Sequence, residues 1–392
     1  MFYKIIKLNV YQYNFVSLFF SKNLLRLLRG LCINISSTSI LFRYLELQGG
    51  YIMEQENINL ILDQYNINIV DIKQQSDKGK KAIWWIKTTS GDKVLKKHSC
   101  SSKTLEFILS AVKHLKNGNI NLSSIIKTKE NKSYIKGVNC CYVLSEAIIG
   151  NTPNEDNPLE LKMIVEALAN FHYASENFVF PSDCKARIHL GLQKQEFQDQ
   201  MQKLKGFYDT EMSTSNHSEF GKIIISSFPY FYKRMQLAIS ENTKSGYDRW
   251  TAYAKSTNCL CHQDFTASNL ILKNSKEIFV LDIDSITVDL PTRDIRKFLN
   301  KIMKKKGHWD SKLTSQILQW YNTRNPLEHW KWQVLKEALI FPHLYVGIMS
   351  KYYEKREISW PEARYIERLK GMIKTEKSIE PILQNFEQII PS

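Results

Sequence analysis

The chain has 392 residues, of which 43% are hydrophobic and 12% are aromatic, which excludes a disordered protein and suits two lobes or two small domains. Its net charge of +15 is compatible with a nucleic acid, an anionic surface or a polyphosphate as partner. The basic residues are scattered, however, and no nucleic-acid-binding motif occurs, so we expect no nucleic acid partner. An odd number of cysteines without a Cys-x-x-Cys pair indicates reduced thiols and synthesis in the cytosol.

Residues 1–52 differ in character from the rest of the chain. Their longest uncharged run, Leu8 to Ser21, is shorter than the roughly 20 apolar residues of a membrane span. No small-x-small cleavage site follows this run, so we expect neither a membrane span nor secretion by a signal peptide. The peptide Gln48–Met53 can be back-translated into a purine-rich ribosome-binding sequence ahead of an ATG. We therefore interpret residues 1–52 as a poorly ordered non-native leader or mis-assigned start, with Met53 as the true start.

Residues 53–149 are expected to form a small lobe with an antiparallel sheet and one helix. A short helix is predicted up to about Leu62. Apolar residues at spacings of three and four predict the main helix over 103–116, with Ser101 or Ser102 as its cap. The expected strands are 67–72, 82–88, 93–96, 133–135 and 141–145.

Residues 150–392 are expected to form a larger, mainly helical lobe. The polar segment Gly150–Pro158 marks the boundary, and Asn157 is expected to cap the helix that Pro158 starts. The helical pattern continues to about Lys255 and returns toward the end of the chain. Between these helical parts, an apolar hairpin is predicted over 258–284.

This hairpin carries the most specific pattern of the chain, which includes His262-x-Asp264 and Asn269, with Asp282 and Asp284 after the next apolar run. Phosphoryl transfer needs charge neutralisation at the phosphates and an aligned hydroxyl, and these residue types supply both. We predict that Asp264 accepts or orients the hydroxyl proton and that His262 braces the loop. Asn269, Asp282 and Asp284 are predicted Mg²⁺ ligands, with both aspartates on one face of an extended strand.

The small lobe supplies the remaining predicted contacts to a nucleotide. Lys96 ends a strand at a place from which a lysine reaches the α- and β-phosphates. Glu106 lies ten residues later on the capped helix and is the expected ion-pair partner of Lys96, with an exposed surface pair as the alternative. Only Gly79 lies near the place of a phosphate-binding loop, which is a weak signal. The whole set predicts ATP and Mg²⁺ as cofactors and an unidentified hydroxyl compound as acceptor.

Three further features of the sequence each have two possible interpretations. Asp294 either braces the predicted catalytic loop, residues 261–269, which precedes the predicted metal site at 282–284, or caps a helix. Cys261 is a thiol nucleophile or, as we favour, a small residue that packs on a strand. A group of aromatic residues forms a substrate wall or, as we favour, part of the core. This group is Trp330, Trp332, Phe341, His343, Tyr345, Tyr352 and Tyr353.

At these motifs the chain resembles the aminoglycoside phosphotransferase/choline kinase superfamily and, more narrowly, the CotS-type spore coat proteins of spore-forming bacteria. Gln263 departs from the His-Gly-Asp usual in the superfamily but resembles the coat-protein branch. The resemblance extends from Met53 to the end of the chain. The segments that carry the narrower resemblance are Cys261–Asp264, Leu281–Asp284, Asp289–Lys297, Phe341–His343 and Lys351–Tyr353.

The resemblance implies an α+β, bilobal protein-kinase-like fold. It also implies synthesis in the mother-cell cytoplasm and deposition in the spore coat, with other coat proteins as partners. Two functions follow from it: an ATP- and Mg²⁺-dependent phosphotransferase with an alcohol group as acceptor, or a non-catalytic structural coat protein. A small-molecule kinase of the aminoglycoside or choline type is a third, weaker reading. Lys96, Asp264, Asn269 and Asp282 are all present, which favours the enzyme.

Overall fold

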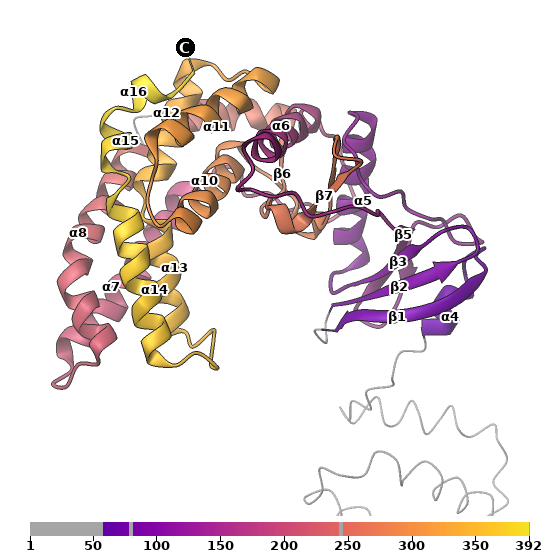
Figure 1. The fold of residues 1–392 in the computed structure, drawn as a ribbon, viewed down its shortest axis with the longest axis horizontal. Helices are drawn as coiled ribbons and strands as arrows, with labels where there is room; N and C mark the ends of the chain where they lie inside the picture. Colours follow the sequence, from indigo (N-terminus) through magenta and orange to yellow (C-terminus); the bar gives the residue numbers. More distant parts are fainter. Residues whose placement is uncertain (1–57, 78–80, 243–245, 392) are drawn as a thin grey trace, which may run out of the picture. The chain divides into compact units, whose positions relative to one another are not determined.

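The computed structural model describes residues 58–77, 81–242 and 246–391 (Figure 1). The expected leader, the expected start at Met53 and Gly79 all lie outside these residues. The predicted boundary near residue 150 stays a prediction, since Asn59 onward forms one compact unit.

A five-stranded antiparallel sheet opens the described fold, after the short helix α4 (Ile58–Leu62). In the sheet the strands lie in the order β1-β2-β3-β5-β4, so the chain passes from β3 to the edge strand β4 before β5 enters between them. This confirms the predicted sheet, although the first strand is longer than expected. The strands are β1 (Ile69–Asp77), β2 (Ala82–Thr88), β3 (Lys93–His98), β4 (Ile135–Lys136) and β5 (Cys141–Glu146).

Helix α5 (Ser102–Asn117) is the single long helix that accompanies this sheet (Figure 1). The hydroxyl of Ser101 accepts a hydrogen bond from the backbone N–H of Thr104 at 3.2 Å, which is the expected cap. Its apolar face includes Leu105 and Ile108, which join a core shared with the helices that follow. The predicted cap and periodicity are thus confirmed.

The remainder is mainly helical, as predicted (Figure 1). The Asn157 side chain accepts from the N–H of Leu159 at 3.0 Å, so Asn157 caps the helix that Pro158 begins. None of the described helices is long and apolar enough to span a membrane. The helices are α6 (Pro158–Ser175), α7 (Gln193–Ser213), α8 (Glu219–Asn242), α9 (Tyr247–Thr257), α10 (Thr292–Lys306), α11 (Ser311–Arg324), α12 (His329–Ile340), α13 (His343–Tyr353), α14 (Glu362–Lys377), α15 (Glu380–Gln384) and α16 (Phe386–Ile389).

Short strands between α9 and α10 form the predicted hairpin. Strand β7 (Leu270–Lys273) pairs antiparallel with β8 (Glu277–Val280). Strand β6 (Leu260–Cys261) pairs with β9 (Thr287–Val288) and holds the two ends of the motif region together. The segments around residues 262 and 284 therefore lie near each other, as the hairpin prediction requires.

Aromatic residues near the C-terminus mostly fill a second core between α7, α8, α13 and α14. Phe341 and Tyr345 are fully buried there, and the ring of Tyr352 stacks on Phe220 with centroids 3.7 Å apart. Trp332 is fully buried in the first core. The core interpretation is therefore confirmed for Trp332, Phe341 and Tyr345, whereas Tyr352 and Tyr353 pack on the second core partly buried. Trp330 is partly buried against a smaller cluster, and His343 also lines a cavity.

Candidate active site

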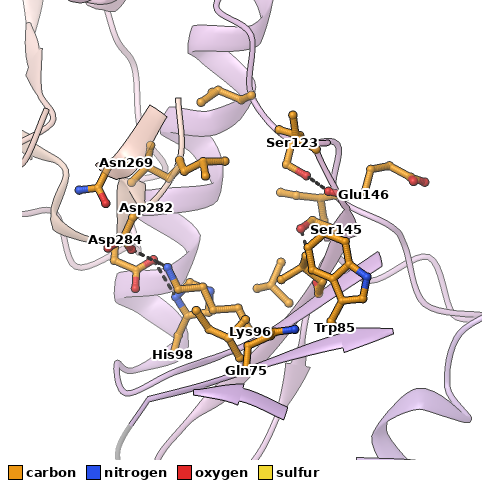
Figure 2. A pocket seen from close by; sticks show the side chains of 18 of the residues that line it. Gln75, Trp85, Lys96, His98, Ser123, Ser145, Glu146, Asn269, Asp282 and Asp284 are labelled. Carbon is orange, nitrogen blue, oxygen red and sulfur yellow. Dashed lines mark hydrogen bonds and ion pairs between the residues drawn. The ribbon is translucent and has the colours of Figure 1, made fainter. Parts of the chain in front are cut away.

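A cleft of about 1050 Å³ lies between the sheet with α5 and the β7–β8 hairpin. Figure 2 shows Asn269, Asp282 and Asp284 on one wall and Glu146 on the wall across from them. The sheet contributes alternate residues of one strand, Val94, Lys96 and His98, because every second side chain of a strand faces the same way. The cleft is large enough for a nucleotide.

Lys96 joins the two walls of the cleft. Its Nζ lies 2.6 Å from Oδ1 of Asp282 and 2.8 Å from Oδ1 of Asp284 (Figure 2). Asp284 is almost fully buried and also meets Nδ1 of His98 at 3.3 Å and Nζ of Lys81 at 3.3 Å. The predicted residues Lys96, Asp282 and Asp284 are thus brought together.

The charge states of this cluster follow from its burial. Burial alone would lower the pKa of Lys96, but the carboxylates of Asp284 and Asp282 outweigh it and raise that pKa. Burial would raise the pKa of Asp284, but neighbouring basic groups, His98 and Lys96 foremost, lower it. Burial lowers the pKa of His98 to about 4, so its ring is neutral at pH 7. At neutral pH the cluster therefore holds a cationic lysine between two carboxylates.

The two aspartates converge for a different reason from the one predicted. They do not lie on an extended strand, because Asp282 has a left-handed backbone with φ of 51° and residues Ile283–Ser285 form a 3₁₀ turn. This tight turn, rather than strand alternation, directs both carboxylates toward Lys96. The strand geometry expected for the pair was wrong, although the expected proximity is present.

Glu106 does not pair with Lys96. Its Oε1 accepts a hydrogen bond from the hydroxyl of Tyr134 at 2.8 Å, and Glu106 does not line the cleft. The reason is the rotation of α5 about its axis. Leu105 and Ile108 line the cleft, and Glu106 lies about 100° around the helix from Leu105. The predicted Lys96–Glu106 ion pair is therefore wrong in this structure.

Asp264 and Asn269 are joined within residues 261–269, the predicted catalytic loop. The side-chain amide of Asn269 donates to the backbone oxygen and to Oδ2 of Asp264, both at 2.9 Å. Because the amide nitrogen is used in this way, the amide oxygen of Asn269 is left for a cation at the edge of the cleft that Asn269 lines. Asp264 is exposed to solvent, where an acceptor can reach it.

His262 makes the loop contacts predicted for it. Its Nε2 lies 2.9 Å from the backbone oxygen of Leu281, and its Nδ1 accepts from the N–H of Asp264 at 3.3 Å. The imidazole therefore carries its proton on Nε2 and links the catalytic loop to the segment that ends at Asp282. It is fully buried, which leaves it as a positioning residue.

Asp294 carries the second brace of the loop. Its carboxylate accepts from the backbone N–H groups of His262 at 2.6 Å and Gln263 at 2.9 Å, and Nε2 of His172 lies 3.3 Å away. The first residue before α10 is Pro291, and no side chain caps that helix end. Of the two interpretations, bracing is the one that the contacts support.

Gln263 and Cys261 are the neighbours of His262 in the sequence. Gln263 has φ of 73°, a left-handed conformation that suits glycine, which accounts for the glycine usual at this position. Its backbone and side-chain oxygens both accept from Lys297 Nζ, at 2.8 and 2.7 Å. Cys261 is fully buried, and burial raises the pKa of its thiol well above the usual value, so it is not a thiolate nucleophile.

The donor set fits a divalent cation and a nucleotide phosphate. Two carboxylates and an amide oxygen are hard oxygen ligands of the kind that Mg²⁺ takes, and Lys96 is beside them. Two further residues, His98 and Lys81, belong to the site and were not predicted. Strand alternation from Lys96 could have found His98, because residues two apart share a face.

Known proteins resemble this chain over most of its length. The family model described as "Spore coat putative kinase YutH" matches residues 58–386. Spore coat protein S of Bacillus subtilis (strain 168) is 28% identical over 337 residues, which cover 86% of this chain and 95% of that protein. The endospore coat-associated protein YutH of the same organism is 24% identical over 190 residues, 48% of this chain and 54% of its own length.

Solved structures show the same fold at low sequence identity. An aminoglycoside phosphotransferase from Alicyclobacillus acidocaldarius matches with a TM-score of 0.73 and 15% identity, covering 87% of this chain and 98% of that one. A spectinomycin phosphotransferase in complex with ADP and spectinomycin matches with a TM-score of 0.59 and 14% identity, covering 86% and 100%. The fold is therefore that of the aminoglycoside phosphotransferases, and with its family model matched over most of its length the chain belongs to the YutH family of spore coat kinase-like proteins.

Proposed function

We propose that this protein is a phosphotransferase of the spore coat that transfers the γ-phosphoryl group of ATP to an alcohol group in the presence of Mg²⁺. The observation that carries the proposal is the position of Lys96 Nζ, within 2.8 Å of both Asp282 and Asp284 in a nucleotide-sized cleft. A cation that must balance two carboxylates in the free protein is well placed to contact phosphates once a metal takes those carboxylates.

The nucleotide would enter between the sheet and the hairpin. Apolar residues such as Val94, Val143 and Ile271 line the cleft and suit an adenine ring. Ile148, just after β5, also lines it, and its backbone N–H makes no hydrogen bond to any other described residue. That N–H can therefore donate to a ring nitrogen of the base.

The chemistry needs few groups. Bound Mg²⁺ would neutralise phosphate charge, held by Asp282, Asp284 and the amide oxygen of Asn269. Asp264 accepts the proton of the acceptor hydroxyl while the oxygen of that hydroxyl forms a bond to the γ-phosphorus. The bond from that phosphorus to the bridging oxygen breaks, and ADP leaves with the electron pair. Asn269 and His262 hold Asp264 in place through their hydrogen bonds.

The names of two relatives support a place of action. Both matched Bacillus subtilis proteins are named for the spore coat, so we propose synthesis in the mother cell and deposition in the coat, next to other coat proteins. A second function, a structural coat protein whose cleft binds nucleotide without turnover, has one observation in its favour: Gln263 at the position usually occupied by glycine. The complete set of polar groups favours the enzyme.

Transfer from ATP separates these functions. The purified protein is incubated with Mg²⁺, γ-labelled ATP and a panel of polyols, sugars and amino alcohols. We expect Asp264→Ala to lower the rate by about 10²–10⁴-fold and Asp282→Ala to remove activity. Asp209→Ala, an exposed aspartate on α7, is the matched control. If wild-type turnover of ATP equals that of the two site variants for every acceptor, the structural function is the correct one.

A further inference from the structure

A second cavity, of about 310 Å³, lies in the helical part of the fold and is strongly basic. It is formed by α7, α10, α13 and the loop after α13, and we call it the basic pocket. Its charged lining consists of five cations and one carboxylate. These are Lys203, Arg293, Arg296, Lys297 and Arg356, with Glu196 as the carboxylate.

Most of these cations already have a partner. Arg293 pairs with Asp289 and with Glu196, the latter at 2.9 Å. Lys203 and Arg356 share Glu354. These pairs fix the walls of the basic pocket and cancel part of its charge.

Arg296 lacks a partner of this kind. It is only 8% exposed, and its guanidinium makes no hydrogen bond or ion pair with any residue that the structure describes. Burial and then the charge of nearby Arg293 lower its pKa to about 10, which leaves Arg296 charged at pH 7. The carboxylates of Glu196, Asp289 and Asp294 offset part of this lowering, but none of them forms an ion pair with Arg296. A guanidinium with so little exposure usually has a direct anionic partner.

Two more polar groups in the basic pocket lack a partner. Oγ of Ser350 and Nε2 of Gln193 are buried and make no hydrogen bond within the described structure. His343 also lines the cavity, and burial followed by the charge of Arg296 lowers the pKa of its ring well below the usual value. The pocket thus presents a cation and unused donors, with no unpaired carboxylate among its lining residues.

Lys297 connects the basic pocket to the catalytic loop. Its Nζ donates to both oxygens of Gln263, and Gln263 immediately precedes Asp264. A molecule held at Arg296 therefore lies against the helix that supports the general base.

We propose that the basic pocket binds the anionic group, a phosphate or carboxylate, of the hydroxyl acceptor. The proposal rests on the proposed function and narrows it: the substrate is an anionic alcohol, such as an acidic sugar or a sugar phosphate, rather than an amine. Arg296 binds the oxyanion through its forked N–H groups, with Ser350 and Gln193 as further donors. The acceptor's free hydroxyl faces Asp264, which takes its proton as the new O–P bond forms and ADP departs.

Binding can be tested without activity, with inorganic phosphate as the probe. At about 10 mM phosphate, we expect the melting temperature of the full chain to rise by about 2 °C if the Kd is ~1 mM. Arg296→Met should remove this rise and Arg296→Lys should keep part of it. Arg324→Met, a half-exposed arginine on α11, is the control for loss of charge. Lys96→Met tests whether the phosphate binds in the nucleotide cleft instead. If it does, Lys96→Met removes the rise in melting temperature; if phosphate binds in the basic pocket, the rise remains.

A second readout separates this role from a structural one. Because Arg296 is buried without a partner, Arg296→Met should melt at the same or a higher temperature than wild type when no anion is present. A purely structural arginine would give the opposite result. Equal stabilisation of wild type and Arg296→Met by phosphate, or no stabilisation of wild type, overturns the proposal.

Acceptor preference completes the test. Matched neutral, anionic and cationic acceptors (glucose, glucuronate, glucosamine) are compared, and we expect transfer to the anionic member. Arg296→Met should raise its KM by about 10–100-fold with a smaller change in kcat. Equal KM values in the two proteins would overturn the acceptor role. Absence of transfer in all proteins, with phosphate binding that depends on Arg296, would instead disprove the proposed function and leave the anion site standing.

Discussion

Gln263 has a long side chain at a backbone conformation that favours glycine. Its left-handed backbone costs about 1–2 kcal/mol for a residue with a Cβ. The side chain offsets this cost through hydrogen bonds to Thr287 and Lys297. Glutamine at this position is therefore compatible with the left-handed conformation of the loop, because its own contacts hold the conformation that glycine would adopt freely.

At position 263, a glycine variant should be more stable than an alanine variant, which is the reverse of the usual order of stability. Gln263→Ala loses the side-chain contacts and keeps the backbone strain, so we expect it to be about 2 kcal/mol less stable than wild type. Gln263→Gly loses the same contacts but relieves the strain and should be about 1 kcal/mol more stable than Gln263→Ala. Equilibrium unfolding in urea measures both differences.

The control for this reversal is an ordinary helical glutamine. At Gln319, exposed in the middle of α11, alanine should be more stable than glycine by about 1 kcal/mol. If alanine is also the more stable choice at position 263, the left-handed conformation does not persist in solution.

Single residues also show which spatial neighbours can be predicted from the sequence. Asp264, Asn269 and Asp282 could be predicted because their spacing and the apolar runs between them specify a hairpin that reunites them. Glu106 could not be placed, because pairing it with Lys96 depends on the rotation of α5 about its axis. The role of Arg296 could not be predicted, since only the folded structure shows that no carboxylate forms an ion pair with it.

At the scale of elements, the start of α10 organises the site. Asp294, in its first turn, binds two backbone N–H groups of the catalytic loop and His172 of α6. One turn of this helix therefore contacts the loop, and the next residues, Arg296 and Lys297, line the basic pocket. The sequence left bracing and capping equally open for Asp294, because both begin with an aspartate near a helix start.

Asp294→Ala should be far more damaging than loss of a helix cap. It leaves two buried N–H groups without an acceptor and removes a buried carboxylate beside His172, so we expect a loss of about 3–5 kcal/mol. Asp310→Ala is the matched control, since Asp310 caps α11 through the N–H of Leu313 at 3.0 Å and should cost about 1 kcal/mol. Chemical denaturation compares the two, and similar losses would show that Asp294 is only a cap.

Across the whole molecule, the cleft couples the sheet to the hairpin. The α+β class and the order of elements could be predicted from hydrophobic periods and helix caps, which are local properties. The link through Lys96 is a long-range property, because it joins residues 186 and 188 positions apart. In the free protein this lysine holds the two walls together with the same carboxylates that a metal would use.

Binding of Mg²⁺ and ADP should therefore stabilise the whole described fold. At 100 times the Kd, the gain in unfolding free energy is about 2.7 kcal/mol, observed as a higher melting temperature. Asp282→Asn should lose the part of this gain that requires Mg²⁺, because it removes a metal ligand beside Lys96. Asp264→Asn should keep it, since Asp264 contacts Asn269 outside the cleft lining. ADP with a chelator gives the metal-free baseline, and equal gains in wild type and Asp282→Asn would place the metal elsewhere.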